Sequence, residues 1–414
     1  MRLMYVCRLF SGLAQSLKQK KWEPRGVPTI YRLIEALDQT NDETLFVFTV
    51  KDKLVGWQAN TIHSFQVEGL RNSVTVIPDN PHISMSSFLK PGYAREFSQY
   101  IQLHRLLRQF SPDLVYFDRV NIYPAALTTY RTKVPVVWRL MGVPSAMHES
   151  LEDMSLVGRL TRKAYQAPFS MVICSRDGSG GEGWMQKALS IATPRRLLLN
   201  GADPFSNRKL SPSLQELVSN NKTKVLFVSR LVENKGCEEF IRGACLVLSR
   251  APEGFCFIIA GAGPLKAQMS QLAEENGFRE NFHFIGDQPH ANIMSLQNAC
   301  DIYVSLNQMC NLTNSNLEAM RAGTCMIMPR SPGFRQIDED TDALVPRECV
   351  WRINKYNDIP GLAEALIHLH NNPKERVSRA IKTGQHAAQM IPSWETRIKS
   401  EISLLEELAS NTSP

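Results

Sequence analysis

Two basic residues follow an apolar run in the second half of the chain. In KVLFVSRLVENKGCEEF the run ends at Ser229, Arg230 and Lys235 come next, and Gly236 precedes a helical segment. Both cations then project from the carboxyl end of a predicted strand, where they would meet a diphosphate. A fixed double positive charge offsets the negative charge that builds on a departing diphosphate. For this pair alone, two solvated surface residues are the alternative interpretation.

A polar loop that enters a short helix is the second element with chemical potential. The stretch NLTNSNLEAMRAG carries Glu318 on the helix that it predicts. The unpaired N–H groups at a helix N-terminus favour phosphate. The carboxylate of Glu318 either accepts hydrogen bonds from two ribose hydroxyls or is favoured simply because it lies near a helix N-terminus.

Glycines follow two further predicted strands. FIIAGAGPL places Gly261 and Gly263 after one apolar run, and FHFIGDQP places Gly286 after another. Glycine lets a backbone approach a ligand closely, but it also permits a tight turn, and both interpretations stay open. The stretch LLLNGAD, with Asn200 and Asp203, ends the first series of predicted strands.

These motifs occur together in an order and at spacings that resemble the retaining GT-B glycosyltransferases of family 4, glycosyl transferases group 1. The resemblance covers nearly all of residues 1–410 and is strongest over 196–330. It rests on five motifs: Asn200-Gly-x-Asp203, Arg230-x4-Lys235-Gly236, Gly261-x-Gly263-Pro264, Phe284-x-Gly286 and Glu318-Ala-Met-x-Ala-Gly.

The resemblance implies roles for individual residues. Arg230 and Lys235 would bind the donor diphosphate and Glu318 the ribose, so these three form the expected catalytic set. Gly26, in the segment WEPRGVPTI taken as the first βα loop, would let the first domain close on the donor. The full set of expected substrate-binding residues is Gly26, Asn311, Asn314, Ser315, Gly263, Gly286 and Arg139.

Two positions depart from the family pattern. The family's usual pair of glutamates is separated by seven residues, and Cys310 stands where the first is expected, eight positions before Glu318. The polar NLTN run is the candidate substitute. Arg139, in VVWRLMG, stands where the family often has a histidine, and it either contacts the sugar or forms a buried ion pair.

The elements that must position these residues follow an α/β pattern that runs twice. Short apolar runs alternate with amphipathic segments such as Glu238–Arg250, which indicates parallel sheets with helices on both sides. The expected strands of the first half are Arg2–Cys7, Thr44–Thr49, Ser73–Ile77, Leu114–Phe117, Val134–Trp138, Met171–Cys174 and Leu197–Leu199. Those of the second half are Lys224–Ser229, Phe255–Ala260, Phe282–Ile285, Ile302–Ser305, Cys325–Met328 and Ala343–Val345.

We therefore expect a GT-B fold with two Rossmann-like, doubly wound domains facing a cleft. The first would span residues 1–205 and take the acceptor, and the second would span 206–390 and bind the nucleotide-sugar. The polar stretch Asp203–Lys224 would link them. Residues 391–414 would cross back to the first domain as an amphipathic helix over Ser393–Ser410.

Composition narrows the class of protein. The 414 residues are 43% hydrophobic and 21% charged, which is typical of a globular chain with two domains. The nine cysteines are odd in number and form no Cys-x-x-Cys pair, so we interpret them as reduced core thiols. No signal peptide and no run of about eighteen apolar residues is evident, so we expect a cytoplasmic protein.

The excess positive charge lies in the first half. Residues 1–205 hold 25 Lys and Arg against 17 Asp and Glu, a net of +8, and the remainder has a net of −1. Such asymmetry indicates either an anionic partner or a basic face that keeps the protein soluble. The segment Leu17–Ile30 gathers lysines and Arg25 around Trp22, which suits an anionic bilayer at the inner face of the membrane, a lipid pyrophosphate or plain solvent. Nucleic acid is not expected, because few stacking aromatics accompany the charges.

Two other motifs compete with this interpretation. Gly178-Ser-Gly180-Gly-Glu-Gly183 matches a dinucleotide fingerprint, but it follows a late strand, so we expect a mobile loop over the cleft instead. Asp338-Glu-Asp340 matches an Asp-x-Asp metal motif, but no apolar strand leads directly into it, so we expect a solvated turn. No metal site is supported, because no metal-ligand spacing is present among the histidines or cysteines.

Sugar transfer is therefore the expected function. The donor would be a UDP- or GDP-linked sugar, with no further cofactor, and the acceptor a glycan or lipid-linked molecule in surface polysaccharide assembly. Two alternatives stay open: a nucleotide-sugar epimerase on the same architecture, and a non-catalytic carbohydrate- or membrane-binding module.

Overall fold

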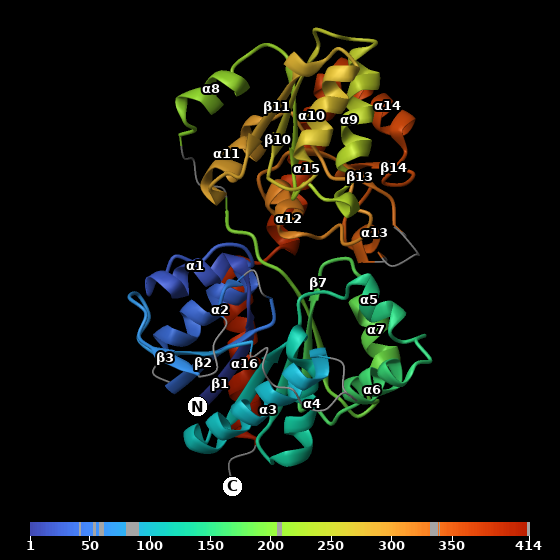
Figure 1. Cartoon of the computed structure of the whole chain (residues 1–414). Helices are drawn as coiled ribbons and strands as arrows, with labels where there is room; N and C mark the ends of the chain where they lie inside the picture. The colour runs from blue at the N-terminus through green and yellow to red at the C-terminus, as the bar shows by residue number, and fades with distance from the viewer. Residues whose placement is uncertain are drawn as a thin grey trace. The chain divides into compact units, whose positions relative to one another are not determined.

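The computed structural model describes residues 1–40, 43–52, 55–57, 62–79, 91–204, 209–331, 338 and 340–411. The chain forms two compact α/β units (Figure 1). The first unit comprises Met1–Ser175, Gly181–Leu198 and Thr396–Pro414, and the second comprises Arg176–Gly180 and Leu199–Glu395. The short segment Arg176–Gly180 thus leaves the first unit and packs with the second.

The first unit is built on an eight-stranded sheet with the order β3-β4-β2-β1-β5-β6-β7-β8. Strands β4, β2, β1, β5, β6 and β7 pair in parallel, and β3 at the edge runs antiparallel to β4. The strands are β1 (Arg2–Leu9), β2 (Glu43–Val50), β3 (His63–Phe65), β4 (Val74–Ile77), β5 (Leu114–Asp118), β6 (Val136–Leu140), β7 (Met171–Arg176) and β8 (Arg195–Leu199).

Both faces of this sheet are covered, which explains why its strands are continuous apolar runs. On one face, Val6 and Val115 share a core with Leu103 and other helix residues. On the other face, the ring of Tyr5 stacks on that of Tyr116, with centroids 4.9 Å apart. The helices of the unit are α1 (Ser11–Gln19), α2 (Pro28–Gln39), α3 (Pro91–Phe110), α4 (Ile122–Arg131), α5 (Ser145–Glu149), α6 (Leu156–Tyr165) and α7 (Gly181–Ala188), with a 3-10 turn at Arg119–Asn121.

The last helix of the chain, α16 (Trp394–Ser410), packs onto this first sheet. Its Glu401 is fully buried and meets Arg139 of β6 at 2.9 Å. Tyr116 of β5 donates its hydroxyl to the same carboxylate at 2.7 Å. The predicted C-terminal helix and its return to the first domain are therefore confirmed.

The second unit has a six-stranded sheet with the order β11-β10-β9-β12-β13-β14, parallel throughout. Its strands are β9 (Thr223–Val228), β10 (Phe255–Ala260), β11 (Phe282–Gly286), β12 (Ile302–Val304), β13 (Cys325–Pro329) and β14 (Val350–Ile353). Its helices are α8 (Pro212–Val218), α9 (Cys237–Leu248), α10 (Lys266–Glu275), α11 (His290–Ala299), α12 (Asn314–Arg321), α13 (Asp340–Leu344), α14 (Ile359–Asn371) and α15 (Pro373–Met390), with 3-10 turns at Glu233–Lys235 and Arg279–Asn281.

Helix α9 shows how the pattern of the sequence produces this packing. Phe240, Ile241, Ala244 and Leu248 recur every three or four residues and are all buried. Phe240 stacks on Phe227 of β9, with ring centroids 4.7 Å apart. This contact fixes the helix directly behind the strand that leads to Arg230.

One predicted strand is wrong. Ala343–Val345 was expected to be a strand, but Asp340–Leu344 forms helix α13 and the last strand, β14, follows at Val350–Ile353. Asp340 and Asp342 lie in the first turn of α13, where carboxylates favour a helix. An apolar run of three residues was too short to distinguish strand from helix.

Two further expectations concern the chain as a whole. Cys310 is partly exposed, and the other eight cysteines are buried free thiols, as predicted. Within the part of the chain that the structure describes, no helix combines the length and apolar character needed to cross a bilayer.

Candidate functional site

Arg230 and Lys235 lie in the loop that follows β9, at the carboxyl edge of the second sheet. The side chain of Arg230 is exposed, and Lys235 ends the 3-10 turn Glu233–Lys235. Two backbone hydrogen bonds join this loop to the loop after β10. The Leu231 amide donates to the Ala262 carbonyl at 2.9 Å, and the Leu265 amide donates to the Leu231 carbonyl at 3.2 Å. The carboxyl ends of parallel strands share one edge, so both cations stand where such folds bind ligands.

Gly261 and Gly263 make this close approach of two loops feasible. A Cβ atom at Gly261 would lie 1.9 Å from the Ser229 carbonyl oxygen, and one at Gly263 would lie 2.2 Å from that of Leu231. The space beside Gly263 is therefore filled by backbone that positions Arg230. Gly286 differs, because its φ is +69° and no atom lies within 4 Å of a Cβ built there.

Lys235 is half-buried between two loops. Gly236, in the left-handed region with φ +69°, packs against Leu306 just after β12, and the Gln308 amide donates to the Asn234 carbonyl at 3.3 Å. Burial lowers the pKa of the Lys235 amine, Arg230 acts in the same direction, and Cys310 and Asp177 oppose it. An anion that contacted this amine would stabilise its charged form.

Cys310, where the sequence resemblance led us to expect a glutamate, has a strained backbone conformation. Its φ is +65°, which is uncommon for a residue other than glycine. Burial raises the pKa of its thiol, and the neighbouring Asp177 carboxyl adds to that rise. Burial also raises the pKa of Asp177 to about 6. A carboxyl group thus lies beside Cys310, but it comes from residue 177, which sequence reasoning missed.

The glycine-rich segment that contains Gly178 packs against the loop before α12. A Cβ at Gly178 would lie 2.7 Å from Asp338 Oδ1 and 2.9 Å from the Asn311 amide nitrogen. The Leu312 amide donates to the Asp177 carbonyl at 3.0 Å. Arg176–Gly180 thus packs within the second unit, whereas Gly181 begins α7 of the first unit, and the mobile loop over the cleft stays a prediction.

Asp338 was predicted to lie in a solvated turn, and this is also wrong. Its side chain is fully buried and accepts hydrogen bonds from Asn311 Nδ2 at 2.8 Å and from Thr341 Oγ1 at 2.6 Å. Burial raises the pKa of Asp338, and these hydrogen bonds oppose the rise. Asp338 joins the loop before α12 to the start of α13.

The start of α12 is fixed by a buried network around Asn316. Its Nδ2 donates to Ser305 Oγ and to the Asn311 carbonyl, both at 3.0 Å, and its Oδ1 accepts from the Tyr303 hydroxyl at 3.1 Å. Thr313 caps the helix by accepting from the Asn316 amide at 3.4 Å. Asn316 was not predicted, although its place in the NLTNSN run was a usable signal.

Asn314 and Ser315 form the first turn of α12, as the sequence predicts. Asn314 Oδ1 accepts from Asn200 Nδ2 at 2.8 Å, and the Ser315 carbonyl accepts from Gln297 Nε2 at 2.9 Å. Both side chains are partly exposed. These two contacts fix the first turn of α12 from neighbouring segments.

Glu318 lies in the second turn of α12 and already has a partner. Its side chain is 6% exposed and meets His290 Nε2 at 2.9 Å, while the side chain of His290 is 48% exposed. His290 is the first residue of α11, which follows β11 and Gly286. A ribose bound to Glu318 would therefore also meet His290, a residue that the sequence did not single out.

Three of the predicted substrate-binding residues have structural roles. Arg139 is fully buried, and its Nε donates to Glu401 at 2.9 Å, so the structure shows the buried ion pair of the two interpretations. Asn311 is fully buried and bound to Asp338. Gly26, with φ +98°, lies between α1 and α2 and does not directly follow β1. The glycine after β1 is Gly12, where a Cβ would lie 2.0 Å from the Arg25 carbonyl oxygen.

The Asn200-Gly-x-Asp203 motif holds the chain where it enters α16. A Cβ at Gly201 would lie 2.8 Å from the Trp394 backbone, and the Trp394 amide donates to Asp203 Oδ1 at 3.1 Å. The Ala202 amide donates to the Pro392 carbonyl at 3.0 Å. This motif therefore has a structural use within the second unit.

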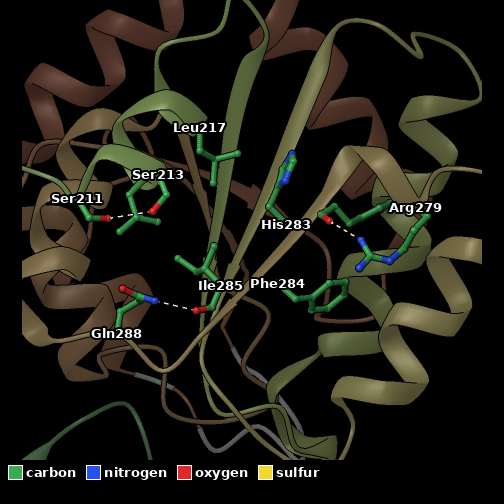
Figure 2. A pocket seen from close by; sticks show the side chains of 10 residues that line it. Ser211, Ser213, Leu217, Arg279, His283, Phe284, Ile285 and Gln288 are labelled. Atoms are coloured by element: carbon green, nitrogen blue, oxygen red, sulfur yellow. Dashed lines mark hydrogen bonds between the residues drawn. The ribbon is translucent and has the colours of Figure 1, made fainter.

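A separate hollow of about 520 Å³ lies beside the edge strand β11 (Figure 2). Its wall is formed by Ser211, Ser213 and Leu217 around α8, by His283 and Ile285 of β11, and by other residues that include Arg279 and Gln288. None of the predicted site residues lines it. It is therefore distinct from the loops that carry Arg230 and Glu318.

The sequence profile of the family Glycosyl transferases group 1 matches residues 213–386. The chain is 33% identical over 98 residues to a 2-deoxystreptamine glucosyltransferase of Streptomyces kanamyceticus. The aligned stretch is 24% of this chain and 25% of that protein. The chain is also 26% identical over 190 residues to a D-inositol 3-phosphate glycosyltransferase of Corynebacterium urealyticum, covering 44% and 42%. The matched stretches thus span less than half the length of these two relatives.

Solved structures resemble the whole chain. Sucrose-phosphate synthase of Thermosynechococcus elongatus superimposes with a TM-score of 0.73 at 13% identity, covering 99% of this chain and 100% of that one. HepE of Anabaena in complex with UDP has a TM-score of 0.66 at 17% identity, covering 98% and 100%.

Two parallel α/β sheets and a long C-terminal helix packed on the first of them define the GT-B fold class. Within that class the family profile lies on the unit that carries Arg230, Lys235 and Glu318. The match to the family Glycosyl transferases group 1 covers residues 213–386, within the second unit, and the whole chain has the GT-B fold.

Proposed function

We propose that this chain is a retaining glycosyltransferase that moves a sugar from a UDP- or GDP-linked donor to a glycan or lipid-linked acceptor. One observation carries the proposal. The loop with Arg230 and Lys235 lies at the carboxyl edge of the second sheet. Close backbone contacts at Gly261 and Gly263 fix it on one side, and a backbone hydrogen bond joins it to the loop that leads into α12. That edge is where parallel α/β sheets bind nucleotides.

The donor diphosphate would bind to Arg230, Lys235 and the N-terminus of α12. Arg230 is exposed, and burial lowers the pKa of the half-buried Lys235 amine, so a bound diphosphate would stabilise the charged form of Lys235 and pair with Arg230. Amides at the N-terminus of α12, beside Asn314 and Ser315, would bind the same group. As the sugar bond breaks, the negative charge on the leaving diphosphate grows, and these fixed charges stabilise it most at that stage.

Glu318 would bind the ribose hydroxyls of the donor. Its carboxylate is nearly buried and is held by His290, which fixes its orientation before the donor arrives. The half-exposed His290 ring can move aside or share the carboxylate with a hydroxyl. HepE, the Anabaena protein of the same fold, has been solved with UDP-glucose, which supports a donor of this chemistry.

Asp177 is the carboxyl group that we propose to face the sugar. It lies close enough to Lys235 and Cys310 to influence both pKa values. It would therefore supply the acidic group that Cys310 cannot. By the family resemblance, the acceptor hydroxyl attacks on the face that the diphosphate leaves, the anomeric configuration is retained and no divalent metal is needed.

The acceptor proposal rests on charge. The first half of the chain has a net charge of +8, which favours an anionic acceptor such as a lipid pyrophosphate or an acidic glycan in surface polysaccharide assembly. One relative is named for 2-deoxystreptamine and another for D-inositol 3-phosphate. Relatives therefore differ in acceptor, whereas the loops around Arg230 concern the donor.

A thermal-shift screen of UDP-, GDP- and ADP-sugars tests the proposal. We expect at least one donor to stabilise the wild type, since a ligand that binds the folded state raises its unfolding temperature. Lys235→Ala and Arg230→Ala should abolish that shift. The matched control is Arg242→Ala, which removes an exposed arginine of the same unit that pairs with Glu238 at 2.7 Å. Equal shifts in all three variants would contradict the assignment of the site.

A turnover assay then separates the proposed transferase from other functions. The wild type should release free nucleotide diphosphate from the stabilising donor, slowly with water and faster with an acceptor. Conversion of the donor alone into an isomeric nucleotide-sugar would indicate an epimerase. A donor that binds without any release of nucleotide diphosphate would indicate a binding module.

A further inference from the structure

Three helices of the first unit present large apolar side chains to the outside. These side chains are between 38% and 73% exposed, far more than a globular core residue. They are Phe97 and Ile101 on α3, Leu127 and Tyr130 on α4, and Leu156 and Leu160 on α6. Met154, just before α6, is 71% exposed as well. Contiguous apolar surface of this kind marks an interaction site more often than scattered single residues do.

The three helices lie side by side on one face of the first sheet. Helix α4 contacts both α3 and α6, and Figure 1 shows the three as neighbours. Leu103, Ala125 and Ala164, one from each helix, belong to the same core below them. The hydroxyls of Tyr123 and Thr161 join α4 to α6 at 2.7 Å. The exposed side chains thus come from three neighbouring helices, and we name their outer surface the α3–α4–α6 face.

Basic residues share these exposed stripes. On α6 the exposed Leu156, Arg159, Leu160 and Lys163 recur at helical spacing on one side of the helix. The other exposed basic residues of the face are Arg105, Arg108 and Arg131. Arg131 and Arg108 both oppose the rise that burial causes in the pKa of Tyr100, so the charges of α3 and α4 meet around this ring.

Acidic residues are nearly missing from the same helices. The sequences of α4 and α6 contain no Asp or Glu, and α3 contains one, Glu96, which pairs with Lys51 on its inner side. Apolar side chains alternating with unopposed cations are the pattern of helices that lie in a membrane interface. Charge complementarity therefore selects an anionic bilayer over an apolar protein partner.

The basic segment around Trp22 is less suited to this task. Its indole nitrogen donates to Glu35 at 3.0 Å, and Lys21 pairs with Glu23 at 2.6 Å. Trp22 and Lys21, which the sequence analysis considered as membrane contacts, are therefore already paired with carboxylates. On the α3–α4–α6 face the exposed Glu152 and Asp153 lie beside Met154, before α6 begins, and helices α4 and α6 themselves carry no carboxylate.

We propose that the α3–α4–α6 face docks on the surface of an anionic lipid bilayer. Leu156, Leu160 and Tyr130 enter the boundary between headgroups and acyl chains, while Arg159 and Lys163 meet lipid phosphates. This inference uses the first unit alone and stands independently of donor binding by the second. It would keep the enzyme at the membrane where a lipid-linked acceptor is found.

Vesicle co-sedimentation of the full chain tests this inference. The wild type should bind mixed phosphatidylcholine–phosphatidylglycerol vesicles and should bind pure phosphatidylcholine vesicles much more weakly. Leu156→Glu/Leu160→Glu should weaken anionic-vesicle binding at least about tenfold, because it places two carboxylates in the interface. Arg159→Gln/Lys163→Gln should weaken it about thirtyfold, since each basic residue near anionic headgroups contributes about 1 kcal/mol.

The matched control is Val377→Glu/Ile381→Glu. These residues are 54% and 53% exposed, four apart on α15 of the second unit, and so repeat the same change on another helix. Three results would overturn the proposal: equal wild-type binding to both vesicle types, no binding to either, or an equal loss in the control. Light scattering adds a fourth, because a dimer that Leu156→Glu/Leu160→Glu dissociates would show that a second copy covers the face.

Discussion

The Arg139 cluster of the first unit and the Arg230–Lys235 loop of the second both gather positive charge, but their surroundings differ. The guanidinium of Arg139 is completely buried and engaged by other protein groups. It pairs with Glu401 at 2.9 Å and donates a hydrogen bond to Ser175 at 3.0 Å. Arg397 completes the cluster with a 2.8 Å contact to the same glutamate. Arg230 is exposed, and Lys235 is half-buried beside Cys310 and Asp177.

The difference shows how a structural cation can be distinguished from a functional one. A buried arginine needs a counter-charge and hydrogen bonds to exist in the fold at all, so its removal acts on stability. A partly exposed pair at the edge of a parallel sheet keeps its charge for a ligand. Substitutions in the two regions should therefore have opposite consequences for stability and for donor binding.

Glu401→Gln should give the largest effect. It leaves the buried Arg139 and Arg397 without their counter-charge, which we expect to lower the free energy of unfolding of the first unit by about 3–5 kcal/mol. Urea denaturation followed by tryptophan fluorescence would measure it. Glu406→Gln, an exposed position on the same helix, is the control and should change it by less than about 0.5 kcal/mol. A Glu401→Gln variant that is as stable as the wild type but fails to bind donor would contradict the structural role of the Arg139 cluster.

Gly263→Ala should follow. The added Cβ would lie 2.2 Å from the Leu231 carbonyl oxygen, so the Arg230 loop must shift, at a cost of about 1–3 kcal/mol. We expect donor affinity to fall with stability, as measured by calorimetry on the folded fraction. Gly183→Ala is the control, because nothing lies within 4 Å of a Cβ there and its helical position favours alanine. Unchanged donor affinity in Gly263→Ala would show that the glycine does not position Arg230.

Asp177→Asn should alter the pH dependence of stability. The pKa of Asp177 is raised from 3.8 to about 6 in the folded state, so between these values the folded chain binds more protons than the unfolded chain. Stability from this group therefore falls as pH rises through that window, by on the order of 3 kcal/mol. Denaturation midpoints at several pH values should show a fall in the wild type that is smaller in Asp177→Asn. Parallel pH profiles would argue against a raised pKa at Asp177.

Lys235→Met should give the smallest change in stability, with a sign opposite to that of Glu401→Gln. Burial lowers the pKa of this amine, so its charge destabilises the empty site at neutral pH. Replacement by an apolar side chain of similar length should raise the free energy of unfolding by up to about 1 kcal/mol. Denaturation without donor checks this directly. A large loss of stability would place Lys235 with Arg139 among the structural cations.

The parts of the site that sequence reasoning found lie close together along the chain. The apolar run before Arg230 forms strand β9, as predicted. Because only five residues separate Arg230 from Gly236, the local sequence was enough to place both at the end of that strand. The same holds for Asn314, Ser315 and Glu318 on α12. Residues 261 and 263 were found too, although the structure shows that they support a loop.

The parts that were missed depend on tertiary packing. Asp177 was not singled out, and the burial of Asn311 against Asp338 was not expected, because only the folded chain brings these loops into contact. Asp338 carries little local sign of burial, because the residues that follow it are Glu339 and Asp340. His290 is one histidine among nine, and its contact with Glu318 depends on how α11 packs against α12.

Isothermal titration of UDP, and separately of GDP, into wild type, Lys235→Met and Arg242→Ala tests the central claim most directly. We predict that one of the two nucleotides binds the wild type and Arg242→Ala alike. Lys235→Met, although at least as stable, should bind it about 10- to 100-fold more weakly, since a hydrogen bond to a charged group contributes about 1.5–3 kcal/mol. Equal affinity in wild type and Lys235→Met would contradict the account.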